Sequence, residues 1–148
     1  QNKGATVLGV TEKTLRDHYQ IRAVLEGYAC VLCVETGADL SALQNCLKAS
    51  EEMLASGDSS RYSDMNQSFH YEIWNASGNE KLVTMLSELW NGLSMGVQTT
   101  EMEYAKKSFA EHKKIYEAIA AKDAETARAQ MEKHIRRSLE DMLTRYRK

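Results

Sequence analysis

Three histidines in this sequence stand beside apolar residues at helical spacing, and imidazole is the side chain that most often binds metals in proteins. His70 lies in the stretch NQSFHYEIW, residues 66–74, between Phe69 and Ile73 on the apolar side. Because an α-helix turns by about 100° per residue, Asn66 and His70 lie about 40° apart on one face. This polar pair is therefore either a hydrogen-bonded detail of the core or part of a site.

The other two histidines repeat this placement in later segments. His112 falls between Phe109 and Tyr116, and His134 adjoins Ile135. Each lies on or next to the inward face of its own predicted helix. Three imidazoles buried separately would need three sets of hydrogen-bond partners, whereas one metal ion satisfies three nitrogens at once. The pattern predicts a metal site, with three separately hydrogen-bonded core histidines as the alternative.

The histidine spacing matches neither a zinc finger nor an HExxH metalloprotease motif. No general base is expected beside the histidines, because Glu111 would point about 100° away from His112 and Glu72 lies off the face of His70. The chain is therefore not predicted to be an enzyme, and a helical hydrolase with a histidine-bound metal is kept as an alternative. The fourth histidine, His18, has no partner at metal-ligand spacing and is predicted to be a surface or linker residue.

The three cysteines, Cys30, Cys33 and Cys46, are few and odd in number. Cys30 and Cys33 form a CVLC motif inside an apolar helical run, and no second pair completes a zinc-binding set. They are predicted to be buried free thiols, which indicates a reducing cytoplasm.

The histidines belong to a chain whose apolar residues recur at helical spacing almost throughout. The spacing predicts six helices, over residues 11–36, 40–55, 60–76, 80–98, 104–121 and 124–146. The sequence contains no proline, which fits long uninterrupted helices. Short turns between the helices predict an all-α fold, an antiparallel bundle of six to seven helices.

Turn and cap residues separate the predicted helices. Gly37 is expected in the left-handed conformation at the end of the first helix, and Asp39, Asn79 and Asp123 are expected to cap the helices that follow them. The first helix is expected to turn one apolar side inwards, made of Leu15, Ile21, Leu25, Tyr28 and Leu32.

The formal net charge of −2 argues against a chain that binds nucleic acid over its whole surface. Basic residues gather after residue 127 and are interpreted as a solvated helix face, with phosphate contact as the alternative. No apolar run approaches the roughly 20 residues that span a membrane, so no membrane partner is predicted.

Three segments follow one another in an order that is typical of a known family: YQIRAVLEGYAC (19–30), NQSFHYEIWNASGNEKL (66–82) and EHKKIYEAIAAKDAETARAQMEKHI (111–135). They resemble the R-x-x-L-E opening helix, the FH…ASGN…L segment and the EH…AI…D…M-x-x-H segment of the FadR-type C-terminal ligand-binding domain, or FCD domain, of GntR transcriptional regulators. The resemblance implies that residues 15–148 form an effector-binding and dimerisation domain. It implies that residues 1–14 are a remnant of a preceding wing and linker.

In that family a winged helix-turn-helix precedes the bundle. The resemblance therefore implies a cytoplasmic, homodimeric metabolite sensor that contacts DNA through an N-terminal domain absent from this chain. It also implies a divalent metal held by His70, His112 and His134, with zinc favoured over nickel or another first-row ion. The position one turn before His70 holds Asn66, where the family more often has Asp. Asp64, about 240° around the helix from His70, is not expected to replace it.

The resemblance implies a small carboxylate or sugar acid as the effector, bound at the metal. An amide ligand such as Asn66 leaves more positive charge on the metal, so an anionic effector or a water would complete the site. Arg22 is the candidate effector-binding cation, with an i, i+4 ion pair to Glu26 as its alternative role. Asn79 is a second candidate contact, with a helix cap as its alternative role. A purely structural dimerisation bundle is the remaining alternative for the chain.

Overall fold

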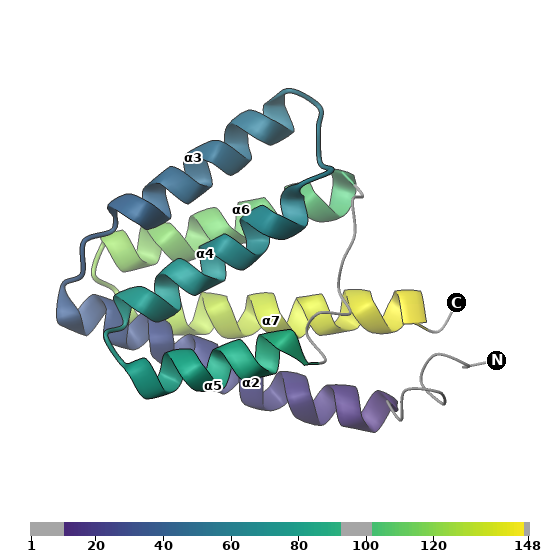
Figure 1. The fold of residues 1–148 in the computed structure, drawn as a ribbon, viewed down its shortest axis with the longest axis horizontal. Coiled ribbons are helices and arrows are strands. Elements are labelled where there is room, and N and C mark those ends of the chain that lie inside the picture. The colour runs from purple at the N-terminus through teal and green to yellow at the C-terminus, as the bar shows by residue number, and fades with distance from the viewer. Residues whose placement is uncertain (1–10, 93–101, 147–148) are drawn as a thin grey trace.

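The computed structural model describes residues 11–92 and 102–146. These residues form six α-helices and no strand: α2 (Glu12–Thr36), α3 (Ser41–Ala55), α4 (Tyr62–Ala76), α5 (Glu80–Asn91), α6 (Met102–Ala120) and α7 (Ala124–Tyr146) (Figure 1). The predicted all-α fold is confirmed.

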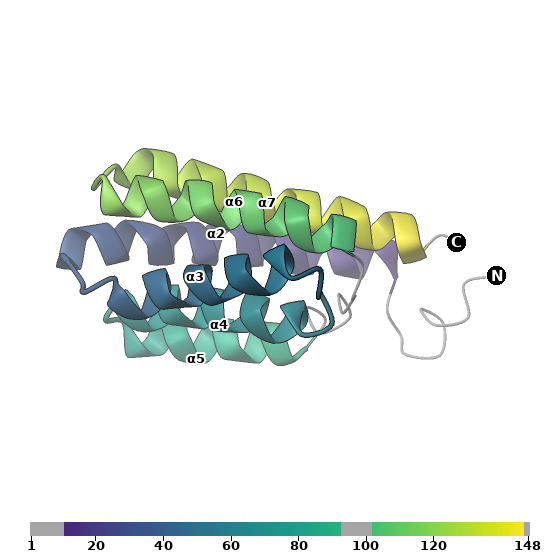
Figure 2. The same cartoon turned by 90° about the horizontal axis from the view of Figure 1, so that it is seen from above.

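Helix α2 is the central element that positions the others. It packs chiefly against α7 and also contacts α4, α5 and α6, while α3 packs on α4 and α6. Figure 2 shows α6 and α7 on one side of α2, and α4 and α5 on the other. The start of α2 and the end of α7 lie at the same end of the bundle (Figure 1). The three helices that carry the histidine pattern, α4, α6 and α7, therefore all border α2.

Capping side chains and a left-handed glycine fix several helix ends. Asn79 and Asp123 each accept a hydrogen bond from the backbone N–H three residues on, at 3.0 and 3.1 Å. Asp39 accepts one from the N–H two residues on, at 2.9 Å. Gly37 ends α2 with φ 65°, a conformation that glycine adopts without steric cost. The predictions for Gly37, Asn79 and Asp123 are confirmed, whereas the N-cap of α3 is Leu40, one residue after the predicted Asp39.

Helix α5 departs most from its predicted bounds. It ends at Asn91 with Gly92 as its C-cap, whereas the apolar spacing predicted a helix to residue 98. Residues 93–98 lie outside the described residues, as do residues 1–10 of the predicted wing remnant. The other helix ends agree with the prediction to within two residues.

The core collects apolar side chains from all six helices. Among the residues at most 2% exposed are Leu15, Leu43, Phe69, Ile73, Leu86, Ile115, Met131 and Ile135. All of these residues except Leu43 and Leu86 come from the four helices that surround the histidines, so the site is enclosed by apolar packing.

The predicted inward side of α2 is wrong in part. Ile21 and Tyr28 are 57% and 48% exposed, and the helix instead turns Tyr19, Arg22 and Glu26 inwards. Two charged residues occupy the buried side because they pair with each other, at 2.7 Å between Nε of Arg22 and Oε2 of Glu26. An apolar side of α2 is consequently left at the surface.

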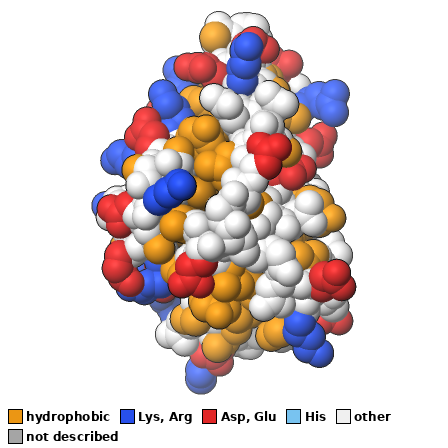
Figure 3. Space-filling view, turned by 90° about the vertical axis from the view of Figure 1, so that its left-hand side faces the viewer, with side chains coloured by type: hydrophobic (Ala, Val, Ile, Leu, Met, Phe, Trp, Pro, Cys, Tyr) orange, Lys and Arg blue, Asp and Glu red, His pale blue; other side chains and the backbone are white. Residues whose placement is uncertain are grey.

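The outer surface mixes charges of both signs. On the end of the bundle shown in Figure 3, acidic and basic side chains alternate around hydrophobic patches, with no extended basic area. A nucleic-acid phosphate backbone needs clustered positive charge, so this end does not have the character of a DNA-binding surface. Within the described segments, no helix has the length and apolar character needed to cross a membrane.

Candidate metal centre

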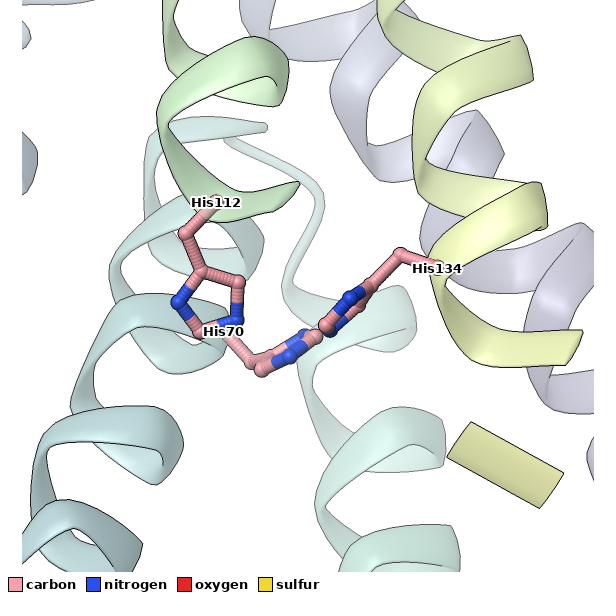
Figure 4. A group of neighbouring side chains, drawn as sticks. All are labelled: His70, His112 and His134. Atoms are coloured by element: carbon pink, nitrogen blue, oxygen red, sulfur yellow. The ribbon is translucent and has the colours of Figure 1, made fainter. Parts of the chain in front are cut away.

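The structure brings the three predicted histidines together in the interior of the bundle. His70 comes from α4, His112 from α6 and His134 from α7, and Figure 4 shows their rings converging. One ring nitrogen of each lies within 4.8 Å of the others. All three side chains are buried. Ring nitrogens from three separate helices thus lie close enough together to be candidate ligands of one metal ion.

Two of the histidines have a carboxylate at their far ring nitrogen. Nδ1 of His70 lies 2.7 Å from Oε1 of Glu26, and Nδ1 of His134 lies 2.6 Å from Oε1 of Glu111. An ionised carboxylate only accepts hydrogen bonds, so Nδ1 carries the proton and Nε2 carries the lone pair. This is the arrangement in which histidines bind metals, with the carboxylate fixing the ring orientation.

His112 is held by aromatic and hydroxyl groups instead. Its ring stacks on Phe69 at 3.9 Å between centroids, with 9° between planes. Its Nδ1 lies 3.4 Å from the hydroxyl of Tyr62, which donates to Ser108 at 2.8 Å. Packing, rather than a charged partner, therefore orients this third ring.

Several buried polar atoms at this point have no hydrogen-bond partner. Among the described residues they include Nε2 of His70, Nε2 of His112 and Oδ1 of Asn66, which precedes His70 by one turn. Buried polar atoms in native proteins are nearly always paired. A divalent metal ion fits this set, because it takes lone pairs from imidazole nitrogens and amide oxygen together. Nitrogens on one zinc stand about 3.4 Å apart, so the rings would move slightly inwards around it.

Glu26 is fully buried, and its contacts with His70 and Trp74 were not predicted from the sequence. Besides His70, it accepts hydrogen bonds from Nε of Arg22 at 2.7 Å and from the indole N–H of Trp74 at 2.8 Å. The guanidinium of Arg22 lies 4.7 Å from the centroid of the Trp90 ring. The ion-pair alternative for Arg22 is therefore confirmed, and the pair links α2 to the histidine site.

Glu111 lies beside His134, although no general base was expected beside the histidines. It does not approach His112, its neighbour in sequence, but it reaches across to α7. There Oε1 meets His134, and Oε2 accepts a hydrogen bond from Nε of Arg137 at 2.5 Å. The sequence signal was a long acidic side chain directly before His112, a candidate metal-binding residue. Such a side chain can reach a neighbouring helix that does not pack on its own face of the helix.

The FCD domain profile matches residues 17–137 of this sequence, which include the three histidines and both carboxylates. The chain belongs to the FCD domain family. The HTH-type transcriptional regulator LutR of Bacillus subtilis (strain 168) is 29% identical to it over 155 residues, covering 96% of this chain and 68% of LutR.

Solved structures share the fold of this FCD domain. E. coli McbR/YncC has a TM-score of 0.81 at 22% identity, covering 92% of this chain and 67% of that one. The metal-free FCD domain of TM0439 has a TM-score of 0.78 at 20% identity, covering 91% and 95% of the two chains. The Zn2+-bound FCD domain of TM0439 has a TM-score of 0.74 at 20% identity, covering 90% and 94%.

The electrostatics of the FCD domain keep two of the site histidines neutral. Burial lowers the pKa of His134 to about 4, although the hydrogen bond with Glu111 acts to raise it. Burial, with smaller contributions from His134 and His70, lowers the pKa of His112 well below its ordinary value. Burial would raise the pKa of Glu26, but His70 and Arg22 outweigh it, so the carboxyl pKa lies below its usual range. Neutral imidazole is the form that binds a metal.

The remaining predicted residues have other roles in the structure. Oδ1 of Asn79 caps α5, and no contact of this side chain with the histidines is observed among the residues described. Asp64 pairs with an arginine at the surface, as expected for a residue that does not replace Asn66. His18 is half-buried rather than exposed, and burial lowers its pKa. The three cysteines are free, as predicted, and Cys30 and Cys33 are buried, whereas Cys46, also predicted to be buried, is only partly buried.

Proposed function

We propose that this FCD domain binds a divalent metal through His70, His112, His134 and Asn66 and senses a small organic acid at that metal. The observation that carries the proposal is the group of buried, unpaired atoms on these residues, Nε2 of His70, Nε2 of His112 and Oδ1 of Asn66. A single ion would satisfy them together. The alternative of three separately hydrogen-bonded core histidines leaves two Nε2 atoms without partners.

Zinc is the metal that we favour, with nickel or another first-row ion as alternatives. Three imidazoles and an amide oxygen suit these ions better than magnesium or calcium, which bind carboxylate-rich sites. The Zn2+-bound form of the TM0439 FCD domain, which shares this fold, supports the choice. A bound zinc ion would supply a positively charged centre with open coordination positions for an acid.

The effector in this proposal is a small carboxylate or sugar acid. Its carboxylate would bind the metal, and Arg22 would contribute positive charge from α2. Trp90 supports this role of Arg22, because its ring lies 4.7 Å from the guanidinium carbon and 5.3 Å from the His70 ring centroid. We do not include Asn79 in the effector site, since its side-chain oxygen is engaged as a helix cap.

In this proposal, effector binding would change the affinity of the protein for DNA. LutR, which aligns with nearly the whole chain, is an HTH-type regulator, and a winged helix-turn-helix preceding α2 would supply the DNA contact in the cytoplasm. A homodimer would carry two winged helix-turn-helix domains, and the distance between them would control binding to two DNA half-sites. The effector can shift the equilibrium between two arrangements of the dimer only if it binds them with different affinities.

Metal titration of the purified protein tests the proposal. Zinc or nickel is expected to bind one ion per chain and to raise the free energy of unfolding by about 2.7 kcal/mol at one hundred times its Kd. His134→Ala is expected to abolish that gain, whereas His18→Ala, a matched histidine outside the site, is expected to keep it. Mass-spectrometric metal analysis and thermal unfolding measure both effects.

Two outcomes would overturn the proposal in different ways. Equal metal content and equal melting temperature shifts in the wild type and His134→Ala would show that the proposed residues do not bind the metal. Turnover of simple esters or phosphoesters by the metal-loaded protein, lost in His134→Ala, would favour the hydrolase alternative over the sensor.

A further inference from the structure

His112 differs from the other two histidines in the group that meets its far ring nitrogen. Nδ1 of His70 and Nδ1 of His134 each meet a carboxylate, at 2.7 and 2.6 Å. Nδ1 of His112 instead lies 3.4 Å from the hydroxyl of Tyr62, the first residue of α4. An ionised carboxylate only accepts hydrogen bonds, whereas a hydroxyl can donate or accept. Which ring nitrogen of His112 carries the proton therefore depends on where the Tyr62 hydroxyl directs its hydrogen.

Ser108 sets the direction of that hydrogen. The Tyr62 hydroxyl has one hydrogen, and it donates this hydrogen to Oγ of Ser108 at 2.8 Å. Ser108 lies on α6, one turn before His112, and all three side chains are buried. Hydrogen bonds between hydroxyl groups are most favourable near about 2.8 Å and weaken with distance, so the contact with Ser108 retains the hydrogen. The Tyr62 oxygen is then left with a lone pair facing Nδ1 of His112.

That lone pair favours one tautomer of His112. With the proton on Nδ1, the ring donates a hydrogen bond to Tyr62 and keeps a lone pair on Nε2. With the proton on Nε2, Nδ1 would meet the Tyr62 oxygen lone pair to lone pair. The Nε2 N–H would also be buried without an acceptor among the described residues. Since a buried donor without an acceptor is costly, the Nδ1–H tautomer is the more favourable one.

We propose that Ser108 and Tyr62 together fix His112 as the tautomer with its proton on Nδ1, and so keep Nε2 available to a metal ion. This inference rests on the proposed function and adds two positioning residues to it. Two neutral hydroxyls do for His112 what the carboxylates of Glu26 and Glu111 do for the other two rings. Hydrogen-bond partners behind metal-binding histidines contribute about 10–100-fold to metal affinity. Because the 3.4 Å contact is a long hydrogen bond, we expect a contribution of about tenfold.

Nitrogen NMR of the metal-free protein at neutral pH tests the proposal. Long-range proton–nitrogen correlation spectra separate a ring nitrogen that carries a proton from one that does not. The signals of His112 are assigned by their loss in His112→Gln. The wild type is expected to carry the proton on Nδ1, and a proton on Nε2 overturns the proposal.

Two variants remove the hydroxyls one at a time. Ser108→Ala removes the acceptor of the Tyr62 hydrogen, which can then turn to Nδ1, so the His112 proton is expected to shift towards Nε2. Tyr62→Phe removes the acceptor of Nδ1, so a mixture of the two tautomers is expected. A loss of packing alone would lower the free energy of unfolding without moving the proton. An unchanged tautomer in both variants therefore overturns the proposal.

Matched controls make the same changes elsewhere in the bundle. Ser50→Ala removes a buried hydroxyl that donates to the backbone carbonyl of Cys46 within α3. Tyr116→Phe removes a hydroxyl from the groove between α3 and α6. Both controls are expected to keep the wild-type tautomer of His112 and the wild-type zinc affinity, and a shift as large as in the two variants overturns the proposal.

Zinc affinity, measured by competition with a chelator, connects the tautomer to the metal. Ser108→Ala and Tyr62→Phe are each expected to bind zinc about tenfold more weakly than the wild type. Zinc affinities equal to that of the wild type overturn this inference alone, whereas a wild type that binds no zinc overturns both this inference and the proposed function. If neither variant folds, neutron diffraction from wild-type crystals decides. A Tyr62 hydrogen directed at Ser108 supports the inference, and one directed at His112 overturns it.

Discussion

Neutral side chains supply all four of the proposed metal ligands, three imidazoles and the carboxamide of Asn66. The two carboxylates behind the histidines change this charge little, because Arg22 pairs with Glu26 at 2.7 Å and Arg137 pairs with Glu111 at 2.5 Å. A divalent ion in this setting would keep most of its charge. An anion at the open coordination positions would therefore be strongly favoured.

Asn66→Asp tests this charge argument at a single residue. The added carboxylate is expected to raise zinc affinity by about tenfold, roughly 1.4 kcal/mol. It is also expected to weaken the mutual enhancement of zinc and acetate binding, because the two affinities are reciprocally linked. Zinc titrations against a competing chelator, with and without acetate, measure both quantities. Asp64→Asn, at the surface of the same helix, is the control, and an unchanged affinity in Asn66→Asp would show that residue 66 does not contact the metal.

The buried histidines also predict how the metal-free protein responds to pH. In the unfolded chain His134 takes up a proton below its ordinary pKa near 6.5, whereas in the fold its pKa is about 4. The unfolded state therefore binds more protons between these values, and the free energy of unfolding falls by about 3 kcal/mol as the pH drops from 6.5 to 4. The lowered pKa of His112 acts in the same direction.

Urea unfolding of the metal-free protein between pH 5 and 8 measures this dependence, above the range in which carboxylates titrate. His134→Gln is expected to reduce the slope below pH 6.5. A wild-type slope equal to that of the variant would contradict the neutral, buried state of His134.

The convergence of the three histidines could be predicted from sequence, but their supporting carboxylates could not. His70, His112 and His134 each adjoin apolar residues at helical spacing, and spacing reports which side of a helix faces inwards. Glu26 and Glu111 lie on helices whose mutual orientation decides what their long side chains reach. That orientation is set by packing between helices, which a pattern within one helix does not contain.

Close packing between α2 and α7 depends on a glycine. A methyl group on Gly27 would lie 3.0 Å from Cγ of Arg128 and 3.1 Å from Cγ of Glu132. Both atoms are near the α7 backbone, so they yield less easily than the ends of long side chains. The absence of a side chain at Gly27 thus allows the two longest helices to approach each other.

Gly27→Ala is expected to destabilise the protein by about 1 kcal/mol. Alanine improves helix propensity by about 1 kcal/mol, but overpacking typically costs about 1–3 kcal/mol. Chemical unfolding measures the difference, with the exposed Gln20→Ala on the same helix as the control for propensity. A more stable Gly27→Ala protein would mean that α7 moves aside without cost.

The six helices and most of their ends could be predicted from the sequence, whereas the residues that α2 turns towards the core could not. Turn residues such as Gly37 and Asn79 act through local backbone bonds, which the sequence encodes directly. On α2, Arg22 and Glu26 are buried because each is the partner of the other, while Ile21 and Tyr28 are exposed. Hydrophobic pattern alone assigns such charged residues to the surface.

The exposed apolar side of α2 is where we place the proposed homodimer contact. Ile21, Val24 and Tyr28 are spaced three and four residues apart, and their side chains are 57%, 59% and 48% exposed. Large apolar side chains in such a row on one helix mark a protein-binding surface. In a homodimer with a two-fold axis, which is the usual symmetry, the row on one copy would pack against the same row on the other.

Val24→Glu is expected to convert the dimer to a monomer, because a charge at the centre of this row would be buried without a partner. Light scattering coupled to gel filtration measures the mass. Met85→Glu, at an exposed apolar position on α5, is the matched control and is expected to remain dimeric. A dimer that persists in Val24→Glu would place the contact on another face.

Glu26 has one more consequence at the scale of the whole molecule. It sits on α2, two residues after Val24, yet it holds Nδ1 of His70 from α4 at 2.7 Å. If His70 moves towards a metal, it must either stretch this bond or carry α2 with it. A shift of α2 on metal binding would then also move its outer apolar side, which we place at the contact with the second protomer.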